Sequence, residues 1–173
     1  HKPMLRSYGK RLKKLSGDSL LLAVENGRQR GEDFRKWADD HFFLTMDVEH
    51  FWKYTLGDCT FENFAGLLAG FFDEFGEKVS HVHMPGYLPG APEHRPSYTN
   101  PQFACEVWDR LLESGFSGLA VSESNQEFQT DTHLRRDVIL YQRWEEGNLE
   151  DGLTVQGEVT GEPNPSSERA MRG

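Results

Sequence analysis

The sequence predicts an α/β fold in which parallel strands alternate with helices. Short apolar runs recur four times along the chain, and each is followed by a segment whose apolar residues have helical spacing. Each run is apolar enough for burial on both faces of a sheet, which is typical of parallel strands joined by crossover helices. The pattern is compatible with an open doubly wound sheet and with a closed barrel.

In the first half of the chain, two apolar runs end abruptly in polar residues, as buried strands do. Apolar residues at helical spacing predict one helix before the first run and another between the two runs. In order, we expect a helix over residues 5–15 that ends at Gly17, a strand over 19–26, a helix over 31–40 and a strand over 42–47.

The second half begins with an amphipathic helix that carries five phenylalanines on one side and ends at Gly76. Asn100 followed by Pro101 predicts a later helix start, because an N-cap residue precedes a first-turn proline. In order, we expect a helix from 60 to 76, a strand over 79–84, a Pro/Gly-rich loop over 85–96, a helix over 100–115, a strand over 118–124 and a helix over 132–144. Trp52, Tyr54 and Trp108 are expected to pack in the core.

The 173 residues divide into one domain over 1–146 and a tail over 147–173, where Gly, Glu, Pro and Ser dominate and predict disorder. The net charge of −9 argues against a nucleic-acid or membrane-surface partner, since both require a basic footprint. No apolar run approaches the roughly 20 residues of a membrane helix. Two cysteines without CxxC spacing favour a reduced, cytoplasmic setting.

Carboxylates and imidazoles stand at the ends of all four predicted strands. They are Glu25, Asp47 with His50, His81 with His83, and Glu123. The C-terminal ends of parallel strands meet at one edge, where such carboxylates would repel one another without a cation. Oxygen ligands with one nitrogen favour Mn²⁺, Mg²⁺ or Co²⁺ over a zinc ion.

These strand ends carry the motifs VEN, MDVEH, VSHVHM and GLAVSE in that order, and together they resemble the xylose isomerase-like barrel superfamily. The resemblance covers about residues 19–144. It implies that the chain forms about four βα units, the C-terminal half of a TIM barrel. It also implies a metal-dependent isomerase or epimerase of a sugar, a sugar phosphate or a related hydroxy-carbonyl compound.

The resemblance further implies the roles of individual residues. Metal ligands would be Glu25, Asp47, His83 and Glu123, and Glu25 and Glu123 would also form the acid/base pair that passes a proton through a metal-stabilised enediolate. His83 is preferred to His81 because it stands where the strand should end. His50 would hold substrate hydroxyls.

Two residues of the Pro-rich loop, His94 and Arg95, are further candidates for substrate binding. His94 could instead contact a second metal, as in the apurinic endonuclease-like zinc phosphodiesterases of the same superfamily, which are the alternative function. Those enzymes have an aspartate two residues before the loop histidine, where this chain has Pro92.

Four βα units leave two open sheet edges, which predicts that the isolated chain needs a partner. The expected partner is a second copy of the chain or a missing N-terminal half. A non-catalytic barrel fragment is the third possibility.

Overall fold

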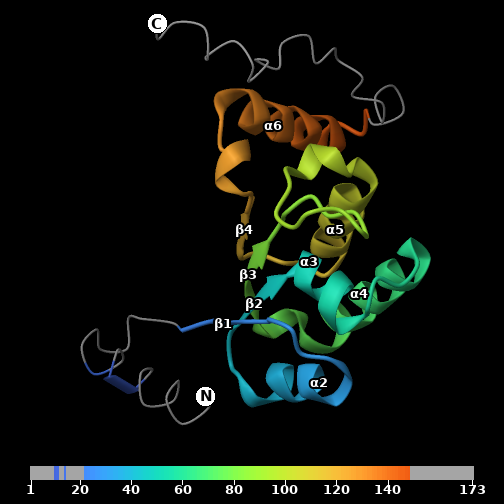
Figure 1. Cartoon of the computed structure of the whole chain (residues 1–173). Helices are drawn as coiled ribbons and strands as arrows, with labels where there is room; N and C mark the ends of the chain where they lie inside the picture. Colours follow the sequence, from blue (N-terminus) through green and yellow to red (C-terminus); the bar gives the residue numbers. More distant parts are fainter. Residues whose placement is uncertain (1–9, 12–13, 15–21, 149–173) are drawn as a thin grey trace, which may run out of the picture.

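The computed structural model describes residues 10, 11, 14 and 22–148, and it contains a parallel sheet with the strand order β1-β2-β3-β4 (Figure 1). The strands are β1 (Val24–Glu25), β2 (Leu44–Asp47), β3 (Val79–His83) and β4 (Leu119–Val121). The prediction of an α/β fold with parallel strands is therefore confirmed. The expected helix over 5–15 and the tail beyond residue 148 lie largely outside the described residues.

Helices connect successive strands, as crossover connections require. They are α2 (Gly31–Asp40), the short α3 (Val48–His50) continued by a π-helical turn (Phe51–Thr55), α4 (Phe61–Phe75) and α5 (Pro101–Glu113). A last helix, α6 (Asp131–Glu145), follows β4. Single 3₁₀ turns cover Gly76–Lys78, Ser97–Thr99 and Gln126–Phe128.

Local capping explains where the three long helices begin. The side chain of Thr60 accepts a hydrogen bond from the backbone N–H of Asn63, and Asn100 caps α5 in the same way. Thr130 caps α6, which therefore starts at Asp131, one residue earlier than predicted.

Aromatic side chains dominate the core between the sheet and α4 and α5. Trp52 stacks on Phe64 at a centroid distance of 4.6 Å and on Phe103 at 5.4 Å. Trp52 and Trp108 are buried as predicted. Tyr54 is not part of this core, because it lies partly exposed on the π-helical turn, where its hydroxyl reaches Glu93.

The prediction that every strand is buried on both faces is wrong. All four residues of β2 are buried, but Leu119 and Val121 of β4 are 57% and 37% exposed. Helices α2, α4 and α5 lie on the same side of the sheet (Figure 1). Within the described part of the chain, β1 and β4 are the edge strands, each with one neighbour.

Within the described part of the chain, every helix is too short or too polar to span a bilayer. Cys59 and Cys105 are free thiols.

Candidate metal centre

The register of the sheet brings the predicted ligands to one face. Asp47 pairs with His83, and His83 pairs with Val121, two residues before Glu123. Glu25 pairs with Thr45, two residues before Asp47. Side chains two residues apart share a face of a strand, and paired residues of neighbouring strands share a face of the sheet. The four side chains therefore project to the same side at the C-terminal ends of the strands.

His83 lies between the two glutamates of this group. Its Nδ1 atom is 2.9 Å from Oε2 of Glu123 and 3.6 Å from Oε1 of Glu25. One ligand atom from each of Glu25, Asp47, His83 and Glu123 lies within 4.8 Å of the others. These four residues form a candidate metal site, which we call the metal centre. The structure thus brings together all four predicted ligands.

Asp47 is the most rigidly held of the four. Its backbone N–H donates to the side chain of Asn26 at 2.6 Å, and the Asn26 amide donates back to the Asp47 carbonyl at 2.9 Å. Oδ1 of Asp47 accepts the N–H of His50 at 2.9 Å and so caps α3. Sequence analysis missed Asn26, although it follows Glu25 directly in the VEN motif.

Three polar atoms of the metal centre are buried without a hydrogen-bond partner. They are Oδ2 of Asp47, Nδ1 of His83 and Oε2 of Glu123. An unsatisfied buried polar group costs about 1–3 kcal/mol, and more when it is charged. A cation bound by these atoms would remove that cost, so the residues present fit a divalent metal. Three carboxylates and one imidazole suit Mn²⁺, Mg²⁺ or Co²⁺.

The pKa shifts at the metal centre follow from this crowding. The neighbouring imidazole of His83 lowers the pKa of Glu25, and Glu25 in turn raises the pKa of His83. Burial raises the pKa of Asp47, and the carboxylates of Glu123 and Glu25 add to that rise. A positive charge among them would oppose the rise for Asp47.

His81 is not a member of the metal centre. Its Nδ1 atom lies 3.0 Å from the hydroxyl of Ser80. His83, the last residue of β3, is the histidine of this strand whose ring nitrogen lies among the carboxylates.

The residues predicted to bind substrate differ in their distance from the metal centre. His50 and His94 flank the metal centre: Nδ1 of His50 is 3.1 Å from Oδ2 of Asp47, and Nδ1 of His94 is 3.9 Å from Oε2 of Glu123. The guanidinium of Arg95 lies 6.0 Å from the ring centroid of Phe128. No contact places it at the metal centre.

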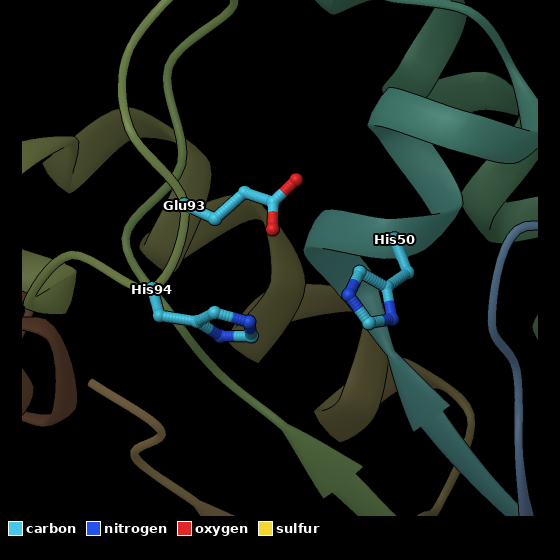
Figure 2. A group of neighbouring side chains, drawn as sticks. All are labelled: His50, Glu93 and His94. Atoms are coloured by element: carbon cyan, nitrogen blue, oxygen red, sulfur yellow. The ribbon is translucent and has the colours of Figure 1, made fainter. Parts of the chain in front are cut away.

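A second group of possible ligands adjoins the first. His50, Glu93 and His94 offer ligand atoms within 4.8 Å of one another, and Figure 2 shows the two imidazoles pointing toward each other. The Glu93 carboxylate already accepts hydrogen bonds from Lys53, at 2.7 Å, and from the hydroxyl of Tyr54. These contacts lower the pKa of Glu93 to about 2.

A further carboxylate beneath the site escaped sequence analysis. Glu49 is fully buried on α3, and its Oε2 atom accepts the backbone N–H of His94 at 2.9 Å. Burial raises its pKa to about 7. Its place between Asp47 and His50 is a weak signal, because an acid at a helix start is ordinarily exposed.

No protein-family model matches this chain, and neither the curated proteins nor the solved structures contain a significant match to it.

Proposed function

We propose that the chain carries the metal centre of an isomerase or epimerase acting on a sugar, a sugar phosphate or a related hydroxy-carbonyl compound. One observation carries the proposal: three carboxylates and an imidazole converge at the C-terminal ends of four parallel strands, with unpartnered buried atoms among them. In parallel α/β folds, substrates bind at that end of the sheet.

Glu25, Asp47, His83 and Glu123 would hold the cation. When bound, a divalent cation polarises a substrate carbonyl and stabilises negative charge on its oxygen. That stabilisation lets carboxylates, which are weak bases, remove a proton from the adjacent carbon.

Exposure separates the roles of the carboxylates. The Asp47 side chain is 0% exposed, so it can bind a cation but has no surface to offer a substrate. The side chains of Glu25 and Glu123 are 43% and 41% exposed. One of these two carboxylates takes the proton from the substrate carbon, and the other returns one to the same or the neighbouring carbon.

The imidazoles of His50 and His94 are placed to hydrogen-bond substrate hydroxyls beside this pair. Arg95 stays a candidate for substrate binding only because it follows His94 in the Pro-rich loop. The fold in this proposal is half of a TIM-type barrel of the xylose isomerase-like superfamily, with a second copy or a further barrel half beside the open edges. We also place the reaction in the cytoplasm, which suits two free thiols.

A zinc phosphodiesterase is the second candidate, and the group formed by His50, Glu93 and His94 favours it because it could hold another cation. The Lys53 ammonium opposes this assignment, since it already neutralises the Glu93 carboxylate. The net charge of −9 is also unfavourable for a nucleic-acid substrate. Metal analysis of the purified protein distinguishes the two: one bound ion supports the isomerase, and three tightly held zinc ions support the phosphodiesterase.

Deuterium exchange tests the proposed function. The Mn²⁺-loaded chain is incubated in D₂O with ketose and aldose sugars and their phosphates, and deuterium next to the carbonyl is measured by NMR. We expect incorporation with at least one of these compounds, and its loss in Glu25→Gln and Glu123→Gln. Glu127→Gln is the matched control, because Glu127 is exposed and follows the same strand. A chain that binds Mn²⁺ but exchanges no substrate proton would be a non-catalytic fragment.

A further inference from the structure

His94 has a backbone conformation that is uncommon for a residue other than glycine. Its φ angle is +54°, in the left-handed region that favours glycine, and Asp58 is the only other described non-glycine residue with a positive φ. Such a conformation costs about 1–3 kcal/mol and persists only where the surroundings enforce it. The contacts that enforce it at His94 therefore identify residues with a defined task.

Two residues from different parts of the chain bind the backbone around His94. Oε2 of Glu49, on α3, accepts the His94 N–H at 2.9 Å. The backbone N–H of Asn125 donates to the His94 carbonyl at 2.8 Å, and the Asn125 side chain donates to the Glu93 carbonyl at 2.9 Å. Both peptide groups that determine the direction of the His94 side chain are thereby fixed.

The base of the same loop is fixed separately. The N–H of Gly86 donates to the carbonyl of Arg95 at 2.6 Å, and a Cβ atom at Gly86 would lie 1.9 Å from the carbonyl oxygen of Pro96. Only glycine permits this close approach. Glu49 and Asn125 are thus not needed to close the loop, which leaves the orientation of His94 as their contribution.

Burying the carboxylate of Glu49 is destabilising, which argues against a merely structural role for its contact. Its side chain is fully buried, and its Oε1 atom has no hydrogen-bond partner. Glu49 follows Asp47 by two residues, so α3 carries Glu49 and the substrate candidate His50 directly after its N-cap Asp47, a candidate metal ligand. Its single hydrogen bond to His94 links the orientation of that histidine directly to the end of β2.

We propose that Glu49 and Asn125 are positioning residues that hold His94 in its left-handed conformation, with the imidazole beside Glu123 and facing His50. The imidazole rings of His50 and His94 are 5.7 Å apart and nearly perpendicular. The consequence for activity rests on the function proposed above, but the orientation itself does not.

Amide hydrogen exchange in the metal-free full chain tests the orientation. Glu49→Leu removes the acceptor at similar volume, and we expect it to accelerate exchange of the His94 amide about tenfold or more. Glu49→Gln retains an acceptor oxygen and should restore protection to within about threefold of the wild type. Asn125→Ala, in a half-buried position, should accelerate exchange several-fold and serves if Glu49→Leu fails to fold.

Gln129→Ala is the matched control. Gln129 donates to the carbonyl of Ser124, next to Asn125, but has no contact with the backbone of His94. Its removal should leave His94 exchange unchanged. A His94 amide that stays protected in Glu49→Leu or Asn125→Ala, or that exchanges equally fast in Glu49→Gln and Glu49→Leu, would overturn the proposal.

Turnover then tests the consequence. With any substrate that passes the deuterium assay, Glu49→Leu and His94→Ala should each lower kcat/KM about tenfold. The kcat/KM of the double variant should be no lower than that of His94→Ala, because both changes remove the same contribution. If the two reductions in kcat/KM multiply in the double variant, Glu49 acts independently of His94. If the wild-type chain turns over no substrate, the proposed function fails while the exchange experiment still decides the positioning.

Discussion

The Nδ1 atom of His83 lies 2.9 Å from Oε2 of Glu123, yet neither atom makes a hydrogen bond. The two residues come from the ends of neighbouring strands, and Oδ2 of Asp47 is unpartnered in the same way. One ligand atom from each of these three residues and from Glu25 lies within 4.8 Å of the others, so the proposed cation would contact all four.

The choice between the two histidines of β3 can be tested directly. His83→Asn should abolish binding of one equivalent of Mn²⁺, because it removes the only nitrogen ligand of the metal centre. His81→Asn is the matched control two residues away and should bind Mn²⁺ like the wild type. Calorimetric titration measures both. Loss of Mn²⁺ binding in His81→Asn but not in His83→Asn would contradict the choice of His83 as the ligand.

Asp47→Asn should have opposite effects on stability with and without metal. Without metal, the amide keeps the Oδ1 acceptor for His50 and removes a buried charge beside Glu25 and Glu123, so the free energy of unfolding should rise by about 1 kcal/mol. Mn²⁺ at 100 times its Kd should stabilise the wild type by about 2.7 kcal/mol and the variant not at all.

Urea unfolding with EDTA and with Mn²⁺ measures this crossing. Glu123→Gln should likewise lose the stabilisation by Mn²⁺. If wild type, Asp47→Asn and Glu123→Gln respond identically to Mn²⁺, the acids at the strand ends have a structural role only.

The contact between Glu93 and Lys53 predicts an acid-dependent loss of stability. The pKa of Glu93 falls from its ordinary value of 4.5 to about 2 in the folded chain. A lowered folded pKa means that the contribution is present above pH 4.5 and is lost as the pH falls toward 2. Glu93→Gln should remove about 2 kcal/mol at pH 7 and flatten the stability curve over that range.

Unfolding at a series of pH values with EDTA present tests this prediction. Lys53→Met removes the principal partner and should flatten the curve over the same range. If the free energy of unfolding falls as steeply with acid in Glu93→Gln as in the wild type, the prediction is wrong.

Phe64 should be the most sensitive position of α4. It is fully buried and stacks on Trp52, so Phe64→Ala should cost about 3–5 kcal/mol of unfolding free energy. Leu67, on the same helix, is 52% exposed, and Leu67→Ala should cost about 1 kcal/mol or less. Thermal or urea unfolding gives both values, and comparable losses would mean that the aromatic stack contributes little.

The features that sequence alone could determine are those with a local cause. Thr60 and Asn100 cap helices within three residues of themselves, so both helix starts are readable from short segments. The alternation of apolar runs and amphipathic segments predicted that the strands are parallel, though not their order in the sheet. Because parallel strands end at one edge, the acids and imidazoles at the strand ends were expected to meet there, and the family resemblance selected Glu25, Asp47, His83 and Glu123 among them.

What only the tertiary structure decided depends on contacts between distant segments. Glu49 and His94 are 45 residues apart, and no local pattern reveals that a carboxylate on α3 binds the backbone of a loop after β3. Tyr54 was expected in the core, but its hydroxyl binds Glu93, 39 residues away, so its side chain turns toward the site. Burial on both faces failed for β4 because helical cover of a sheet depends on where the helices pack, which period and composition do not determine.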